Sequence, residues 1–311
     1  MERLRISKVL EMAPSSNKIT ICGWVRTFRN DRFLAVNDGS TIHNIQLVVQ
    51  REDFEESVLK QLNTGAAIRA VGVLVESQGG GQSVEIQVEE LEILGGADPD
   101  EFPIQMKKHS LEFLREKAHL RFRTNTFSAI FRIRHLLQFA VHKFFHDQGF
   151  YQLHTPIITG SDAEGAGEMF KVTTLDLESL PKLEDGGTDF SQDFFGKPSN
   201  LTVSGQLEAE LAAMSLGQVY TFGPTFRAEN SNTSRHLAEF WMIEPEIAFA
   251  DLKDDMKLAE DCLKSVLGYV LEHGKDDLDF LENREVQSEK QLPQKDRHEH
   301  PLTERLKNVV E

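Results

Sequence analysis

The chain has 311 residues, 40% of them hydrophobic, which is enough to bury a core in each of two domains. Its 50 acidic and 34 basic residues give a formal net charge of -16, which argues against indiscriminate adhesion to nucleic acid or to an anionic membrane. Any contact with RNA must therefore come from a local basic patch. The first residues lack the apolar core of a secretory signal, and no stretch is apolar for long enough to span a membrane.

Two cysteines, Cys22 and Cys262, lie far apart and match no zinc or redox spacing. A disulfide framework is therefore not expected, and a reducing compartment, the cytoplasm, is the default location. Both cysteines are predicted to be small core residues.

Short β-rich runs recur in the first hundred residues, and glycine, aspartate or asparagine separates most of them. The five runs are Ile19–Arg26, Phe33–Val36, Ile45–Val49, Ala67–Val75 and Val84–Ile93, with a helical stretch at Glu52–Leu62. This pattern predicts a five-stranded Greek-key barrel of the OB type, and any other small β-barrel is the alternative. The turn-rich stretch Gly95–Asp100 then predicts a boundary between a domain at 1–100 and a second at 101–311.

From Thr124 the apolar residues follow helical spacing, with Thr124 or Asn125 as the cap and Gly149 as the stop. The elements predicted after this helix are a strand at Phe150–Ile158, a glycine-rich loop at 160–167, and a polar, mobile insertion at 175–200. Two further strands are predicted at Leu201–Ser204 and Val219–Phe222, with a helix at Leu207–Leu216 between them. A hairpin of Phe226–Glu229 and Glu239–Ala250 follows, and then a helix that is capped by Asp251 and runs to His273.

The predicted hairpin carries side chains that together can hold a nucleotide. Arg227 offers a planar fork that can bridge a carboxylate and a phosphate, and Phe240 can stack on a base. Glu229 can hold an amino group or a metal-bound water, while Arg235 and His236 can reach distal phosphates. For any one of these residues alone, a salt-bridged surface loop is the simpler interpretation.

The ordered pattern Phe226-Arg227-Ala228-Glu229 followed by Arg235-His236-Leu237-Ala238-Glu239-Phe240 resembles motif 2 of the class IIb aminoacyl-tRNA synthetases, the aspartyl, asparaginyl and lysyl group. The strand Leu153–Ile158, with Pro156, is similar to motif 1, which lies at the dimer interface of that class. The resemblance implies an α+β fold, an OB-type β-barrel followed by a partial antiparallel-sheet catalytic domain, and a homodimer. It implies ATP with Mg2+ as cofactors, Arg227 as the catalytic residue, and an ATP site of Arg227, Glu229, Arg235, His236, Leu237 and Phe240.

Two further segments match the amino-acid pocket of these synthetases, and the residues implied are Glu164, Ser204, Gln206, Glu210 and Arg227. Glu164 and Gln206 would accept from the substrate ammonium group, and Arg227 would hold its carboxylate. The aspartyl pattern Ser-Pro-Gln-Leu-Tyr-Lys contrasts with Ser-Gly-Gln-Leu-Glu-Ala-Glu at 204–210, where an acid can accept from a carboxamide and repel a carboxylate. We therefore expect the asparaginyl type, with Glu210 as the discriminating residue and Glu208 as the alternative.

The expected barrel offers cations, an aromatic ring and an amide on adjacent strands, which suits single-stranded bases. The resemblance implies that Arg26, Phe33 and Gln46 recognise the central uracil of the tRNA(Asn) anticodon. A purely structural role for Phe33, in the barrel core, is the competing interpretation.

Motif 3, the glycine-rich strand and helix that carries another arginine, has no counterpart after Glu246, and Glu272–Glu311 is mostly polar. We therefore expect a chain that ends before the catalytic domain is complete, with the magnesium ligands beyond it and little activity of its own. The predicted function is ligation of asparagine to tRNA(Asn) through an asparaginyl-adenylate. An aspartyl enzyme and a non-catalytic tRNA-binding or dimerisation module are the alternatives, whereas an asparagine synthetase fits poorly because such relatives lack the barrel.

Overall fold

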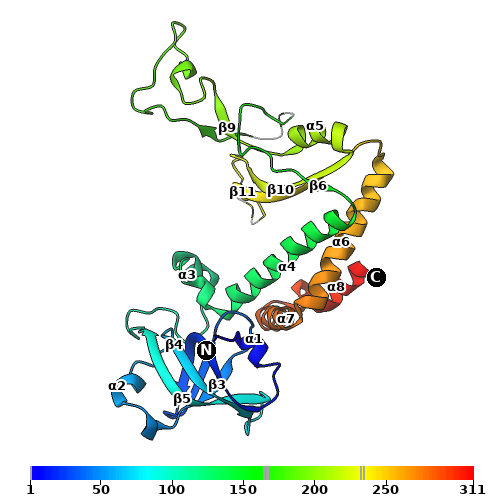
Figure 1. Cartoon of the computed structure of the whole chain (residues 1–311). Coiled ribbons are helices and arrows are strands. Elements are labelled where there is room, and N and C mark those ends of the chain that lie inside the picture. Colours follow the sequence, from blue (N-terminus) through cyan, green and yellow to red (C-terminus); the bar gives the residue numbers. More distant parts are fainter. Residues whose placement is uncertain (1, 164, 166–167, 232, 234) are drawn as a thin grey trace. The chain divides into compact units, whose positions relative to one another are not determined.

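The computed structural model describes residues 2–163, 165, 168–231, 233 and 235–311 (Figure 1). Its internal contacts divide the chain into two compact units, here called the barrel unit (Met1–Leu137 and Tyr269–Asn308) and the hairpin unit (Gln138–Gly268 and Val309–Glu311). The predicted domain limits, 1–100 and 101–311, were based on composition and remain a prediction.

Five strands of the barrel unit close into a barrel in the order β1-β2-β3-β5-β4. They are β1 (Ser15–Arg29), β2 (Phe33–Asn37), β3 (Ile45–Val48), β4 (Ala67–Glu76) and β5 (Val84–Gly95). Neighbouring strands are antiparallel except β3 and β5, which are parallel. All five predicted strands are confirmed, in the arrangement of an OB barrel.

The barrel closes around side chains that alternate along its strands. In β2, Leu34 and Val36 are fully buried whereas their neighbours are half-exposed, and in β3 Ile45 and Leu47 are fully buried. Successive side chains of a strand point to opposite faces, so this period of two places one face inside the barrel. Gly72 is required by a close approach of β5, because a Cβ there would lie 2.1 Å from the carbonyl oxygen of Gln87.

Short helices accompany the barrel, and the predicted helix at 52–62 is reduced to η1 and α2. The short elements of this unit are α1 (Ile6–Val9), η1 (Arg51–Asp53), α2 (Glu56–Leu59), α3 (Leu111–Glu116), η2 (Arg121–Arg123) and η4 (Gln294–Asp296). Ser110 caps α3 by accepting from the Phe113 N–H at 3.2 Å.

Three longer helices contribute residues to this unit: α4 (Asn125–Asp147), α7 (Lys275–Glu289) and α8 (Leu302–Val310). Arg132 of α4 donates to both carboxylate oxygens of Asp277 in α7, at 2.8 and 2.7 Å, and to the carbonyl of Gly39 at 3.1 Å. Glu282 of α7 accepts from the backbone and the hydroxyl of Thr303, the latter at 2.5 Å. The polar end of the sequence is therefore helical and held by charge-assisted hydrogen bonds.

The hairpin unit contains two three-stranded sheets and the helices α5 (Gln206–Leu216) and α6 (Leu252–His273). One sheet has the order β11-β10-β6, formed by β11 (Glu239–Ile247), β10 (Gln218–Phe226) and β6 (Tyr151–Gln152) (Figure 1). The other has the order β7-β9-β8, formed by β7 (Ile158–Thr159), β9 (Ser199–Leu201) and β8 (Lys171–Val172). The predicted caps are confirmed, since Thr124 accepts from Phe127 before α4 and Asp251 accepts from Lys253 before α6.

The predicted strand at 150–158 is wrong in its middle, because residues 153–157 are irregular and separate β6 from β7. Pro156 has no N–H to give to a neighbouring strand. The two ends of the segment are still attached, by Leu153 N–H to the Tyr220 carbonyl at 2.9 Å and by Thr202 N–H to the Ile157 carbonyl at 2.8 Å.

Residues 219–229 were predicted as two strands, but a single strand, β10, ends at Phe226. Arg227 therefore lies just beyond the strand. Likewise, residues 202–204, predicted as a strand, lie in a turn before α5.

The polar segment at 175–200 makes local turns, including η3 (Phe190–Gln192). Asp193 near its end accepts from the Thr174 N–H at 2.9 Å and from the Thr174 hydroxyl at 2.8 Å. Hydrogen bonds from the Thr173 hydroxyl and the Thr174 backbone hold the pKa of the Asp193 carboxyl well below its usual range. The predicted mobility of this segment remains a prediction.

The two cysteines are free thiols, and each is only partly buried, so the prediction of core positions for them was wrong. Cys22 lies on β1 and Cys262 on α6. In the part of the chain that is described, no helix combines the length and the apolar character needed to cross a membrane.

Candidate functional site

The antiparallel register of β10 and β11 decides which side chains share a face. Phe240 lies opposite Thr225, Met242 opposite Gly223, and Glu244 opposite Thr221. Since side chains of a strand alternate, Phe240, Met242 and Glu244 point to one face of the hairpin. Helix α5 packs on this same pair of strands, where Ala209 and Ala213 contact Val219.

The opposite face of the hairpin carries aromatic rings. Phe145 of α4 stacks on Tyr220, with ring centroids 4.4 Å apart, and His142 shares a hydrogen bond of 2.8 Å with the Tyr220 hydroxyl. Phe222 and Trp241 form an edge-to-face pair at 5.3 Å on this side. Apolar and aromatic packing therefore supports this face of the hairpin.

Arg227 continues the hairpin by one residue, because its N–H donates to the carbonyl of Ala238 at 3.0 Å. Its guanidinium lies over the ring of Phe240, 5.4 Å from the centroid, and its Nη2 reaches the carbonyl of Val203 at 3.5 Å. The Nε of Arg227 is buried and has no hydrogen-bond partner among the described residues. A buried unpaired donor costs about 1–3 kcal/mol, so this nitrogen suits an anionic group that would accept from it.

A cavity of about 350 Å³ opens in front of Arg227. Its lining consists of Arg227, Glu229, Ser231, Arg235, His236, Leu237, Ala238 and Phe240. All six residues predicted to bind ATP are therefore brought together on one cavity. Arg235, His236 and Leu237 are exposed at its edge, and the His236 ring is held by the Thr233 hydroxyl at 2.5 Å.

The residues predicted for the amino-acid pocket meet at the first turn of α5. The Ser204 hydroxyl accepts from the Gln206 N–H at 3.0 Å, and Gln206 Nε2 donates to the Glu210 carboxylate at 2.9 Å. Val203, whose carbonyl meets Arg227, directly precedes Ser204, so this group adjoins the ATP group. Glu164, predicted here as well, lies outside the described residues.

Glu244 lies in the hairpin that was predicted to hold a nucleotide, but no role of its own was predicted for it. Its carboxylate accepts from the Ser204 hydroxyl, from the Gly205 N–H at 3.2 Å and from the Thr221 hydroxyl at 2.8 Å. The signal was present in the sequence, because Glu244 stands four residues after Phe240 on the same strand and therefore on the same face.

Gly205 has no room for a side chain. A Cβ at this position would lie 2.9 Å from Thr155 Oγ1 and 3.0 Å from Thr221 Cγ2. The aspartyl pattern has proline at this point, and proline has no N–H to offer Glu244. The local structure is therefore built for the Ser-Gly-Gln order of this chain.

Glu246, two residues beyond Glu244 on β11, is a carboxylate that we did not predict. Burial raises the pKa of Glu246, and the neighbouring charges of Glu210, Glu244 and Asp255 raise it further. The site thus contains an acidic group next to the residue expected to recognise the substrate side chain. Of the two candidates, Glu210 is the one joined to Gln206 and coupled to Glu246.

The residues predicted to bind the anticodon are not joined to one another by hydrogen bonds among the described residues. Phe33 projects from the outer face of β2 and has Arg32 over its ring at 5.6 Å, so it is not part of the barrel core. Gln46 is directly paired with Ala35 on β2, and it donates to Glu85 at 3.0 Å. Arg26 instead donates to the carbonyl of Arg123 and to Asn125 Oδ1, both at 2.5 Å. No hydrogen bond of the described chain joins Arg26 to Phe33 or Gln46.

Among the described residues one group has the makings of a metal site: Glu285, Glu289 and His298, in the barrel unit. His298 hydrogen-bonds to Glu289, and Arg305 donates to Glu285 at 2.5 Å. These contacts fasten the segment after α7 to that helix. The hairpin residues are not part of this group.

Comparison with known proteins agrees with the architecture. The model for tRNA synthetases class II (D, K and N) matches residues 110–303, and a model for the OB-fold nucleic acid binding domain matches residues 19–94. An OB barrel followed by a class II catalytic domain with a motif 2 hairpin defines an aminoacyl-tRNA synthetase architecture. The chain belongs to the class II tRNA synthetases of the aspartate, lysine and asparagine group.

Individual relatives show to which amino-acid type within this group the chain is similar. The asparagine–tRNA ligase of Cytophaga hutchinsonii is 56% identical over 316 residues, which cover 100% of this chain and 65% of that protein. The asparagine–tRNA ligase of Porphyromonas gingivalis is 57% identical over 90% of this chain and 61% of its own length. The asparaginyl-tRNA synthetase of Pyrococcus horikoshii, solved with asparaginyl-adenylate, superposes with a TM-score of 0.74 at 28% identity, over 90% of this chain and 61% of that one. The chain thus spans less than two thirds of the length of these relatives.

The raised pKa of Glu246 predicts a pH-dependent effect of its removal. The folded protein holds this proton more tightly than the unfolded chain, so the wild type loses stability as pH rises from the ordinary value of 4.5 through the raised pKa. Glu246→Gln, which cannot ionise, is expected to melt at a higher temperature than the wild type at pH 7, and this advantage is expected to disappear at about pH 4. Thermal unfolding at the two pH values measures it. An equal effect of the substitution at both would contradict the assignment.

Proposed function

We propose that the protein of which this chain forms part ligates asparagine to tRNA(Asn) through an asparaginyl-adenylate. The observation that carries this proposal is the single polar face of the β10–β11 hairpin, where the 350 Å³ cavity adjoins Ser204, Gln206 and Glu210. The relatives named above support it, because they are asparagine enzymes over nearly the whole of this chain. We further propose a cytoplasmic location, where aminoacylated tRNA is consumed.

In this proposal ATP occupies the cavity, with its adenine against Phe240 and its α-phosphate against Arg227. The donors present fit this ligand, because the buried Nε of Arg227 has no hydrogen-bond partner among the described residues, and Arg235 and His236 lie at the open edge of the cavity. The asparagine carboxylate attacks the α-phosphorus in line and pyrophosphate leaves. Arg227 touches both reactants and stabilises the negative charge that develops between them, so catalysis is positioning and electrostatics without a covalent enzyme intermediate. The motif 2 loop would then place the terminal ribose of the tRNA against the adenylate.

Selection of asparagine over aspartate follows from the acids around the first turn of α5. Glu210 accepts one hydrogen bond, from Gln206 at 2.9 Å, and has acceptor capacity left for the carboxamide of the substrate. A substrate carboxylate would bring another negative charge beside Glu246, whose pKa is already raised by burial and then by the charges of Glu210 and Glu244. Aspartate is therefore disfavoured by charge.

Magnesium accompanies ATP in this proposal and would neutralise its phosphate charge. In the described chain, the group of three metal-type ligands belongs to α7 and the segment after it, and the hairpin offers no such group. The protein steps given above therefore rely on Arg227 and its neighbours alone.

The barrel provides the tRNA contact of this proposal. Phe33 and Gln46 lie on adjacent strands of its outer face, where an aromatic ring and an amide suit an unstacked base. Because the net charge of the chain is -16, such a contact must be local and sensitive to salt.

We also propose a homodimer through the motif 1 segment. Tyr151, Ile157 and Ile158 are large apolar residues with 60%, 45% and 43% of their surface exposed. Exposed apolar residues gathered on one short segment suit a protein interface.

Dimerisation is tested by sedimentation velocity of the 311-residue chain. The wild type is expected to sediment as a dimer, and Ile157→Asp is expected to shift it to a monomer because a charge cannot be buried unpaired in an apolar interface. Leu177→Asp, at an apolar residue 74% exposed elsewhere in the hairpin unit, is the matched control. A wild-type monomer at all concentrations would exclude this interface.

The enzymatic proposal is tested by ATP–pyrophosphate exchange on this chain and on a version extended to the full length of the relatives. Exchange is expected with asparagine and not with aspartate in the extended protein. Arg227→Ala is expected to lower that exchange about 10²–10³-fold, the usual effect of removing a group that stabilises transition-state charge. Arg51→Ala, at an exposed arginine of the barrel, serves as the control.

Exchange with aspartate at a comparable rate would overturn the role of Glu210. No exchange with either amino acid in the extended protein would instead favour a tRNA-binding module without catalysis.

The RNA-binding proposal is tested separately by filter binding of tRNA(Asn) at fixed salt. Phe33→Ala and Gln46→Ala are each expected to weaken binding by about 1–3 kcal/mol, the range for loss of a stacked or specifically bonded base. Gln61→Ala, at an exposed glutamine after α2, is the control. Unchanged affinity in both test variants would place the anticodon contact elsewhere.

A further inference from the structure

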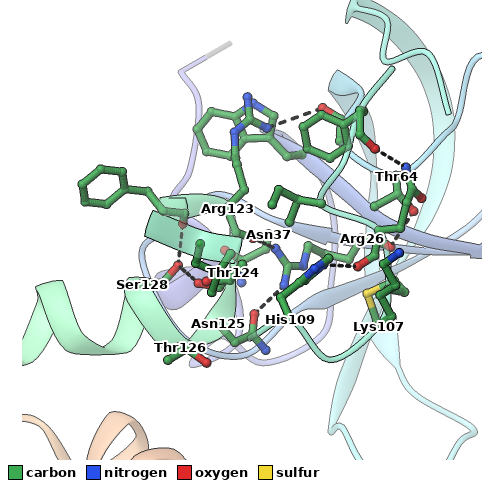
Figure 2. Close-up of a pocket in the computed structure, with 18 of the residues that line it drawn as sticks. Arg26, Asn37, Thr64, Lys107, His109, Arg123, Thr124, Asn125, Thr126 and Ser128 are labelled. Atoms are coloured by element: carbon green, nitrogen blue, oxygen red, sulfur yellow. Dashed lines mark hydrogen bonds between the residues drawn. The ribbon is translucent and has the colours of Figure 1, made fainter. Parts of the chain in front are cut away.

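The barrel unit contains a second cavity, of about 540 Å³, that the proposed reaction does not use (Figure 2). One side is the outer face of β1, with Trp24 and Arg26. The remaining sides are formed by residues 102–109, the linker that follows the barrel, and by residues 121–126, which lead into the start of α4. Arg284 of α7 completes the lining.

The charge of this cavity is opposite to that of the chain. Five basic residues line it, and no aspartate or glutamate does. The five are Arg26, Lys107, Lys108, Arg123 and Arg284. Within the described part of the chain, none of them forms an ion pair with a carboxylate, although acids outnumber basic residues by 50 to 34.

Arg26 and Arg123 form a like-charged pair at the centre of this lining. The two terminal nitrogens of Arg26 donate to the Arg123 carbonyl and to Asn125 Oδ1, both at 2.5 Å, which fixes the guanidinium in place (Figure 2). Burial lowers the pKa of Arg26, and the charge of Arg123 lowers it further. Two cations held together without a carboxylate are destabilising, and a bound anion would relieve their repulsion.

Aromatic rings stand beside these cations. The Arg123 guanidinium lies over the ring of Trp24, 4.7 Å from the centroid, and Trp24 and Phe122 remain 39% and 48% exposed. A flat heteroaromatic ring can stack on such residues, while Lys107 and Lys108, both exposed on the linker, can reach a phosphate. The volume lies in the usual range for a small-ligand pocket.

We propose that this pocket binds the phosphate of a nucleotide, with its base against Trp24 or Phe122. Two sources share this chemistry, a free mononucleotide and a nucleotide of an RNA strand, and the volume and the cover provided by the linker favour the free mononucleotide. The site is separate from the hairpin cavity, which lies in the other compact unit, so it does not depend on the proposed enzymatic function.

The chain has two tryptophans, so Trp241→Phe leaves Trp24 as a reporter inside the pocket. The 311-residue chain in this background is titrated with adenosine monophosphate, with inorganic phosphate and with a short uridine oligoribonucleotide, and Trp24 fluorescence is followed. The test variant is Lys107→Gln with Lys108→Gln. Both lysines are exposed, so folding is expected to be kept. Lys253→Gln with Lys275→Gln, at two other exposed lysines, makes the same change in net charge.

The mononucleotide is expected to change Trp24 emission saturably. The Lys107 and Lys108 variant is expected to weaken its binding about tenfold, because two exposed charge contacts to the phosphate are lost. Inorganic phosphate is expected to compete. Arg284→Gln gives an independent test, since it removes a cation from a different element and is expected to weaken binding as well.

A response to the oligoribonucleotide without one to the mononucleotide, lost in the same variant, would assign the phosphate to RNA. Absence of any saturable response, or equal affinities in the test and control variants, would overturn the proposal. Because Trp24 lines this pocket and does not line the hairpin cavity, a failed exchange assay for the hairpin site would leave the result unaffected.

Discussion

The carboxylate of Glu244 is the contact on which the candidate site depends. It accepts from Ser204, from the Gly205 N–H and from Thr221, and so ties the first turn of α5 to the hairpin. Gln206 and Glu210 follow on that turn, and the neighbouring Val203 carbonyl receives Arg227. One partly buried acceptor therefore fixes the first turn of α5 against the hairpin. Charged acceptors of this kind make stronger hydrogen bonds than neutral ones, which suits a role in positioning.

Much of the architecture could be predicted from local patterns. The barrel strands alternate between buried and exposed residues, as Leu34 and Val36 show, and that period of two is visible in the sequence. Helix α4 was equally visible, because Thr124 and Gly149 mark its ends. The six residues predicted to bind ATP could be grouped from the sequence because they follow one another within fifteen positions of a single hairpin, and they line one cavity. Both the helices and strands and this part of the site could be predicted because the residues that define them lie close together in the sequence.

What could not be predicted depends on contacts between distant residues. Glu244 has its partners at Ser204 and Gly205, about forty positions away, and nothing in the local pattern of β11 points to them. The irregular segment between β6 and β7 also has a distant neighbour, because Thr155 lies close to Gly205. Arg26, expected on the RNA face, is captured by the carbonyl of Arg123, 97 residues later. Local helix and strand propensities do not show which of several distant partners a side chain will bind.

Gly205 has a consequence for how the two amino-acid specificities of this family can be exchanged. A side chain at this position meets Thr155 and Thr221, and a proline would also take away the N–H that Glu244 accepts. If Glu210 is the discriminating acid, as we propose, its replacement by a lysine would not be independent of the turn that carries it. In that proposal the two residue patterns are coupled through the backbone at Gly205, so a single substitution on α5 would not convert one pattern into the other. Such coupling would preserve the asparagine pattern, because Gly205 and the acid on α5 would each disfavour substitution of the other.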